Sequence, residues 1–316
     1  MTEGNGSTPK DSGGKPSAAW ADDLKREFPE AKLDEPLARY TTFRIGGPAD
    51  AWLELRARDE ARRLLAFCRE RGAPLTVLGF GSNVLIRDGG VRGVVVRLKG
   101  DFEKLEFLDG GRVRAGAAVR APQLVTACAE RGLAGAEPLV GVPGTVGGAL
   151  VMNAGTRDGE IGDLVVEVEA LDPRELSLRT LPRAEIGFGY RRSGLENVVV
   201  LAGLLQLKDG DKADIMARVQ KLQQRRQQTQ PIHTFNVGST FKNPPGRFVA
   251  QLIEQAGLKG HALGGARISP MHANFIENHS RASANDVLAL VALAREKVKA
   301  AFGIELELEM KIIGEA

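Results

Sequence analysis

Hydroxyl, ammonium and amide groups are concentrated in one loop of the sequence, residues 236–244 (NVGSTFKNP). Ser239 directly follows a glycine there, and Lys242 and Asn243 come shortly after it. Such groups can hold an anionic ligand and deliver a proton to it. A short turn capped by Ser and Thr would use the same residue types, so the loop alone leaves both interpretations open.

A second polar segment, residues 188–193 (FGYRRS), places Tyr190, Arg191 and Arg192 beside a glycine and away from any helical face. A solvated turn with a tyrosine in the core would look the same. The residues alone favour that structural explanation over a functional one.

The end of the chain predicts a strand over residues 304–312. Its apolar positions (Ile304, Leu306, Leu308, Met310, Ile312) alternate with charged ones (Glu305, Glu307, Glu309, Lys311). A polar strand face is ordinarily solvated, but one carboxylate could instead point into a cleft as a general acid. Glu307 and Glu309 share a face, so a register shift of two residues would exchange them.

Glycine clusters in three segments: residues 44–48 (RIGGP), 79–83 (GFGSN) and 141–148 (GVPGTVGG), the last followed by 153–155 (NAG). Ordering glycine is entropically costly, so such loops commonly mark a close approach of ligand or backbone. The loop at 79–83 lacks the fingerprint of a Rossmann site, and residues 84–86 continue as strand. Two such loops could clamp a diphosphate with their amides, although plain tight turns remain the alternative.

Composition excludes several classes of protein. With 316 residues, 43% hydrophobic, and a net charge of only +3, the chain describes a soluble globular protein of two or three packed units without a nucleic-acid partner. The four histidines lack metal-ligand spacing, and Cys68 and Cys128 are expected to be reduced core residues. No apolar run could span a bilayer and no signal-peptide pattern is present, so we expect a cytoplasmic protein.

Hydrophobic periodicity predicts the elements that position these loops. Helices are expected at 57–71, 122–131, around 215–222, at 249–256 and at 285–302; strands are expected at 51–55, 74–78, 94–98, 104–117 (a hairpin broken at 109–111), 165–171, 176–181 and 198–207. The class is α+β with mixed sheets. We predict a disordered tail at 1–19, a first domain at 20–208 with subdomains near 20–100 and 101–208, and a second domain at 209–316.

Taken together and in order, seven segments closely resemble the UDP-N-acetylenolpyruvoylglucosamine reductases, the MurB family. They are residues 40–47 (YTTFRIGG), 79–83, 142–148, 152–155 (MNAG), 188–191, 238–244 and 272–275 (HANF). The likeness runs from about Tyr40 to Gly314.

The resemblance implies a non-covalent FAD-binding unit of the vanillyl-alcohol-oxidase (PCMH) type, made of two α+β subdomains, and a smaller α+β substrate domain. NADPH would reduce the flavin, leave, and be replaced in the same cleft by the enolpyruvyl ether of UDP-N-acetylglucosamine. The product would be UDP-N-acetylmuramic acid, a peptidoglycan precursor. We expect a monomer with no membrane partner.

The matching motif positions carry the family's roles onto this chain. Arg191 and Glu309 would polarise or neutralise the enolpyruvyl carboxylate, and Ser239 would donate the proton. The residues expected to bind FAD are Tyr40, Arg44, Ile45, Gly79, Gly81, Ser82, Asn83, Pro143, Gly144, Thr145, Gly147, Gly148, Asn153, Ala154 and Gly155. Those expected to bind substrate are Tyr190, Lys242, Asn243, His272 and Lys311.

Three features depart from the common family pattern. Lys311 stands where an arginine is common, which replaces a bidentate fork by a point charge. Thr229 stands where many members have lysine before Gln230-Pro231, so a phosphate contact is missing or supplied elsewhere. No Tyr-Gly-Asp-Leu-like stretch lies between Arg191 and Ser239, which is typical of the shorter type without a substrate-capping tyrosine loop.

Two other functions remain open from sequence. An FAD oxidase of the same superfamily, acting on an alcohol or a hydroxy acid, would share the glycine loops but would not need Ser239 with Glu309. A non-catalytic UDP-sugar-binding protein would not need to retain Arg191, Ser239 and Glu309 together.

Overall fold

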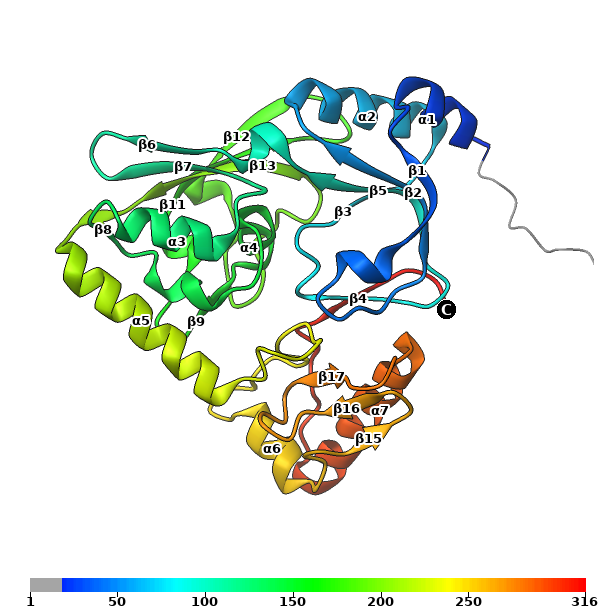
Figure 1. The fold of residues 1–316 in the computed structure, drawn as a ribbon, viewed down its shortest axis with the longest axis vertical. Coiled ribbons are helices and arrows are strands. Elements are labelled where there is room, and N and C mark those ends of the chain that lie inside the picture. Colours follow the sequence, from blue (N-terminus) through cyan, green and yellow to red (C-terminus); the bar gives the residue numbers. More distant parts are fainter. Residues whose placement is uncertain (1–18) are drawn as a thin grey trace, which may run out of the picture.

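The computed structural model describes residues 19–316, which form three packed units (Figure 1). The predicted tail at 1–19 lies, except for Ala19, outside the described residues. The first unit is a sheet in the order β1-β2-β5-β3, with β2 and β3 both parallel to β5. Its elements are α1 (Ala21–Glu27), β1 (Lys32–Pro36), β2 (Pro48–Leu55), α2 (Arg58–Arg71), β3 (Leu75–Val77) and β5 (Val91–Leu98).

The second unit is an antiparallel sheet in the order β12-β11-β13-β7-β6, with two helices beside it (Figure 1). Its main elements are β6 (Leu105–Leu108), β7 (Arg112–Gly116), α3 (Ala121–Ala129), α4 (Val146–Met152), β11 (Val165–Leu171), β12 (Leu178–Pro182) and β13 (Val199–Gln206). Two small two-stranded sheets pair β8 (Leu133–Ala134) with β14 (Lys208–Asp209), and β9 (Gly155–Thr156) with β10 (Gly159–Glu160), the latter as a hairpin. The predicted hairpin broken at 109–111 is confirmed, and the predicted strands at 165–171 and 176–181 correspond to β11 and β12, which pair as a second hairpin.

The long helix α5 (Lys212–Thr229) leads to the third unit (Figure 1). That unit contains α6 (Val249–Gln255), the sheet β15 (Ala262–Leu263), β16 (Ala266–Ile268), β17 (Ile276–Asn278), and α7 (Ala284–Phe302). Short 3-10 turns complete the chain at Leu37–Tyr40, Gly100–Glu103, Glu137–Gly141, Ile161–Asp163 and Arg183–Glu185.

Local signals account for the helix ends. The periodic apolar residues of α2 stop at Gly72, whose φ of +62° closes the helix in the left-handed conformation that glycine adopts without strain. At the other end of the chain, Ser283 caps α7 by accepting from the amide of Asp286, and Gly303 closes it with a φ of +69°. The predicted helices at 57–71 and 285–302 are therefore confirmed.

The predicted strand over 304–312 is wrong in its extent. Only β18 (Lys311–Ile313) is a strand, and it pairs in parallel with β4 (Val84–Ile86) of the first unit. The preceding residues meet the rest of the protein through the isolated bridge between Phe241 and Leu308. Alternation indicates which side chains are buried, but a strand also needs a partner along its length.

Packing crosses the boundaries between the units. One large core combines buried residues of α1, α2 and both main sheets, while the core of the third unit includes Phe43, Ile45 and Leu85 from the first. Asp88 of the first unit also caps α7, because its carboxylate accepts the amides of Ala284 (2.9 Å) and Asn285 (3.2 Å). The third unit is thus fastened to the first at several points.

Replacing Asp88 by alanine should lower the free energy of unfolding by about 1–2 kcal/mol, because two amides at the start of α7 lose their acceptor. Urea denaturation followed by circular dichroism would measure the change. The control is Asp109→Ala in the exposed turn between β6 and β7, which should change stability by less than about 0.5 kcal/mol. Equal effects of the two variants would show that capping of α7 is not the cause.

Candidate active site

A cavity of about 1450 Å³ lies where the three units meet, and most of the predicted site residues line it. Those in its wall are Gly79, Gly81, Ser82, Asn83, Pro143, Gly144, Thr145, Gly147, Gly148, Ala154, Gly155, Arg191, Ser239, Asn243, His272, Glu309 and Lys311. Predicted residues that do not line it are Tyr40, Arg44, Ile45, Asn153, Tyr190 and Lys242. Roles for all of them in binding stay predictions.

The first glycine loop follows β3 and is held against the backbone of Tyr40. Gly81 has a φ of +71°, and a Cβ atom there would lie 2.3 Å from the carbonyl oxygen of Tyr40. Arg97 fixes both segments, donating to the carbonyl oxygens of Gly79 (3.1 Å) and Tyr40 (2.9 Å). Tyr40 therefore shapes the loop through its main chain, while its ring stacks on Trp52 with 3.8 Å between the centroids.

The second glycine loop leads into α4, and its adjacent residues Gly147 and Gly148 differ in how much space surrounds them. A Cβ atom on Gly147 would lie 2.9 Å from the Cβ of Ala117, so the protein's own packing excludes a side chain there. At Gly148 the nearest atom would be the Thr145 hydroxyl at 3.6 Å, an ordinary contact, and the residue is exposed. The protein itself therefore leaves room for a side chain at Gly148, as expected of backbone that a ligand approaches.

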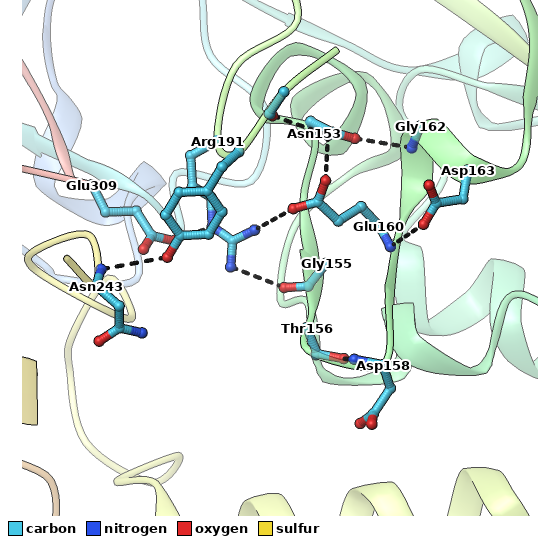
Figure 2. Close-up of polar contacts among 12 residues, drawn as sticks. Asn153, Gly155, Thr156, Asp158, Glu160, Gly162, Asp163, Arg191, Asn243 and Glu309 are labelled. Atoms are coloured by element: carbon cyan, nitrogen blue, oxygen red, sulfur yellow. Dashed lines mark hydrogen bonds and ion pairs between the residues drawn. The ribbon is translucent and has the colours of Figure 1, made fainter. Parts of the chain in front are cut away.

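Arg191 occupies a tight turn of the second unit and is surrounded by acceptors (Figure 2). The main chains of Gly189 and Arg192 bond reciprocally across the turn, and Arg191 has a φ of +56°. Its Nε donates to Glu309 Oε1 at 2.7 Å, and its Nη2 donates to the carbonyl oxygen of Gly155 at 3.1 Å. The guanidinium lies 4.9 Å from the ring centroid of Tyr190, which is itself 47% exposed.

Glu309 and Glu307 lie in different surroundings, which distinguishes their roles in the structure. Its backbone amide donates to Thr240, and its carbonyl oxygen accepts from the Asn83 side chain (3.2 Å), so it sits between the serine loop and the first glycine loop. Burial raises the pKa of Glu309, and the neighbouring Arg191 offsets only part of that rise. Glu307 instead is 72% exposed and pairs with Lys242, so the structure assigns the cavity carboxylate to Glu309.

The loop that carries Ser239 is clamped by Asn274 of the third unit. The backbone of Asn274 accepts from Thr240, and its side chain accepts from Phe241 N (3.0 Å) and donates to Phe241 O (2.8 Å). Ser239 lines the cavity, and its hydroxyl makes no hydrogen bond to another residue within 19–316. It is thus free to donate to a ligand.

Other predicted substrate residues have structural partners. The Asn243 side-chain oxygen accepts from the amide of Val249 at the start of α6 (3.0 Å), and Lys242 points toward Glu307. Burial lowers the pKa of His272, which favours the neutral imidazole, and its Nδ1 accepts from the Asn274 amide at 3.3 Å.

Sequence reasoning missed several charged residues. Arg97, Arg120, Arg225 and Arg226 line the cavity. The buried Arg120 Nε has no hydrogen-bond partner among the described residues, and its guanidinium carbon lies 3.2 Å from the Phe80 ring centroid. Glu160 was also missed, although it forms an ion pair with Arg191. None of them belongs to a glycine loop or to a recognisable motif, so no local signal points to them.

Neither a metal-ligand cluster nor a membrane-spanning helix occurs in the described residues. Residues 19–316 contain no group of three or more His, Cys, Asp or Glu side chains that could hold a metal ion. Over the same range no helix is long and apolar enough to cross a membrane.

Comparison with known proteins places the chain in a family. The family model described as UDP-N-acetylenolpyruvoylglucosamine reductase, C-terminal domain, matches residues 230–313, and an FAD binding domain model matches residues 49–180. UDP-N-acetylenolpyruvoylglucosamine reductase 2 of Symbiobacterium thermophilum is 43% identical over 282 residues, which are 89% of this chain and 91% of that protein. The corresponding reductase of Anaeromyxobacter dehalogenans (strain 2CP-C) is 44% identical over 298 residues, 94% of this chain and 90% of that protein.

A solved structure shares the fold. The crystal structure of the reductase (MurB) from Thermus caldophilus matches with a TM-score of 0.77 and 39% identity, over 90% of this chain and 98% of that one. The expected fold class, α+β with an FAD-binding unit of the vanillyl-alcohol-oxidase type, is confirmed. The chain therefore belongs to the UDP-N-acetylenolpyruvoylglucosamine reductase (MurB) family.

Proposed function

We propose that this protein is the NADPH-dependent flavoprotein that reduces the enolpyruvyl ether of UDP-N-acetylglucosamine to UDP-N-acetylmuramic acid. The observation that carries the proposal is the placing of Arg191, Glu309 and Ser239 in the wall of one cavity with both glycine loops. An oxidase of alcohols would have no use for this cation, carboxyl and hydroxyl together.

The residues of the cavity fit FAD. Gly148 leaves space that a side chain would fill, and the buried Arg120 Nε lacks a partner among residues 19–316, as a cation awaiting an anionic ligand would. The two glycine loops and Arg120 would hold the diphosphate. The cavity of about 1450 Å³ exceeds the ~300–1000 Å³ typical of a single small-ligand site, which suits a cofactor and a second ligand together.

Bound FAD supplies the two-electron chemistry that links NADPH to the terminal methylene carbon of the enolpyruvyl group. Negative charge then develops beside the substrate carboxylate, where Arg191 can stabilise it by hydrogen bonds, joined by Glu309 once that carboxyl takes up a proton, the form that burial favours. The Ser239 hydroxyl donates the proton to the adjacent carbon. Serine is a weak acid in water, so this step depends on orientation and on the exclusion of solvent.

Lys311 and Thr229, which depart from the common family pattern, both lie in the cavity wall. Arg225 and Arg226, from the same helix as Thr229, also line the cavity. Arg225 and Arg226 would supply the cationic phosphate contact that Thr229 cannot make. The cytoplasm stays the expected location, because Cys68 and Cys128 are free thiols in buried positions.

Anaerobic stopped-flow absorbance tests the function directly. The purified yellow protein should be bleached by NADPH and then regain its flavin absorbance rapidly when mixed with the enolpyruvyl ether, with UDP-N-acetylmuramic acid as product. Recovery of absorbance with oxygen alone would instead support the oxidase. Absence of flavin even after added FAD would contradict both.

Ser239→Ala should slow reoxidation by substrate about 10²- to 10⁴-fold because the proton donor is lost. Glu309→Gln should slow it by roughly 10²- to 10³-fold because charge beside the carboxylate is less well stabilised. Both variants should keep FAD and reduce normally with NADPH in the same instrument. Ser280→Ala and Glu305→Gln, which change exposed residues outside the cavity wall, are the controls. A wild-type substrate rate in Ser239→Ala or Glu309→Gln would remove that residue from its role.

Gly148→Ala should weaken FAD binding roughly 10- to 100-fold, the cost of forcing a methyl group into a packed contact with a ligand. Its apoprotein should melt no lower than wild type, because the protein has room for the Cβ atom. Gly147→Ala is the contrast, since its Cβ would press on Ala117 and destabilise the apoprotein. Fluorescence titration with FAD and thermal melting measure the two effects; unchanged FAD affinity in Gly148→Ala would show that FAD does not approach this residue.

A further inference from the structure

Arg191 lies between the carboxylates of Glu309 and Glu160 (Figure 2), and of these two residues only Glu309 lines the cavity. Its Nε donates to Glu309, which lines the cavity, while its Nη1 lies 3.4 Å from Oε1 of Glu160, which does not. The third nitrogen, Nη2, donates to the carbonyl oxygen of Gly155. Glu160 therefore contacts Arg191 from behind, away from the space where substrate would bind.

Glu160 and Gly155 belong to one small hairpin that holds the two terminal nitrogens of the guanidinium. The strands β9 and β10 pair Glu160 directly with Gly155, and a Cβ atom on Gly155 would lie 2.5 Å from the Cα of Glu160. Glu160 is further fixed by its amide, which donates to Asp163 Oδ2 at 2.9 Å. Both acceptors for the two terminal nitrogens thus come from a short, closely packed element.

Asn153 ties this hairpin to the turn that carries Arg191. Its Nδ2 donates to Glu160 Oε2 (2.6 Å) and to the carbonyl oxygen of Gly189 (3.0 Å), and its Oδ1 accepts from Gly162 N (3.0 Å). The residue is only 3% exposed, and its φ of +44° ends α4 in a left-handed cap. With every side-chain polar atom engaged inside the protein, Asn153 is placed to organise Arg191, and a contact with FAD stays a prediction.

Arg191 needs such support for two physical reasons. Its backbone φ of +56° is costly for a residue other than glycine, so the turn persists only when its surroundings hold it. A long arginine side chain also loses considerable rotamer entropy when it is fixed. A guanidinium has five N–H donors; three are used by Glu309, Glu160 and Gly155, which leaves 5 − 3 = 2 for an incoming carboxylate.

We infer that Glu160, held by Asn153, is a positioning residue for the reduction of the enolpyruvyl group. It fixes the plane of the Arg191 guanidinium so that the remaining donors point at the substrate carboxylate while Nε stays on Glu309. The inference rests on the proposed function, because it assumes that Arg191 acts on that carboxylate.

The charges around Arg191 predict which kinetic quantity should change when Glu160 is replaced. The charge of Glu160 cancels that of Arg191 (+1 − 1 = 0), so this ion pair offers an anionic substrate no net attraction. Removing the charge of Glu160 therefore should not weaken substrate binding, although it frees the guanidinium to move. A positioning role predicts a loss of rate without a loss of affinity, whereas damage to the hairpin would lower both.

The test is Glu160→Gln, which keeps the length of the side chain, compared with wild type in the two half-reactions. NADPH reduction and FAD content should stay within about twofold of wild type, and reoxidation at saturating substrate should slow roughly 10- to 100-fold, the effect of a small misplacement at a reacting group. The substrate concentration at half-saturation should stay equal or fall. Glu160→Asp, which retains the charge one methylene short, should recover part of the rate.

Glu185→Gln is the matched control, because this exposed glutamate of the second unit has a side chain without a hydrogen bond or ion pair to residues 19–316. A double-mutant cycle supplies a second readout. In an Arg191→Lys background, Glu160→Gln should cost less than about threefold, since residues acting through one group are not additive.

Different results would overturn the positioning role and the proposed function. An unchanged reoxidation rate in Glu160→Gln, a parallel loss of FAD and substrate affinity, or additive effects in the cycle would each overturn the positioning role. Failure of the wild-type protein to be reoxidised by the enolpyruvyl ether would instead overturn the proposed function, because that measurement does not involve Glu160.

Discussion

The pairing of Arg191 with Glu309 joins residues that are 118 positions apart. It places a guanidinium and a carboxyl group side by side in the cavity wall. The side chains of both residues are only 16% exposed. A buried ion pair loses nearly as much in desolvation as it gains in attraction, so it contributes little to stability. At Glu309 the effect of burial on the pKa exceeds the opposing effect of the Arg191 cation, so the pKa is raised. The fold therefore holds in place a pair that adds little to its own stability.

Two main-chain arrangements place the partners. The parallel pairing of β18 with β4 returns the end of the chain to the first unit, and the Asn83 side chain and main chain fasten Glu309 and Lys311 beside the first glycine loop. On the other side, the Asn153 side chain fixes two left-handed residues by hydrogen bonds, Asn153 itself at the end of α4 and Arg191 in its turn. Strained conformations of this kind persist where the surrounding structure over-determines them, and they are common at functional sites.

Local sequence patterns predicted the elements whose signals are local. The apolar period and Gly72 defined α2, and Asp109 with two glycines marked the hairpin of β6 and β7. The strand at 304–312 was overextended because alternation reports burial, whereas pairing depends on β4, more than two hundred residues away. The same limit explains why Glu307 and Glu309 could not be told apart from sequence. Glu160 was missed for a related reason, since its position depends on a hairpin of two-residue strands that carries no periodic signal.

The predicted domain boundary between residues 208 and 209 lies just ahead of α5, yet the physical connections run across it. Phe43, Ile45 and Leu85 complete the core of the third unit, Asp88 caps α7, and the Asn278 side chain donates to the carbonyl oxygen of Phe43 at 3.0 Å. Because β18 also returns to β4, the end of the chain adds a further connection to the first unit. Rigid attachment of this kind suits the proposed reaction, in which the Ser239 hydroxyl would act on a substrate carbon and the Arg191 guanidinium, from a different unit, on the neighbouring carboxylate. The glycine loops can then remain open to a ligand while the side chains opposite them stay fixed.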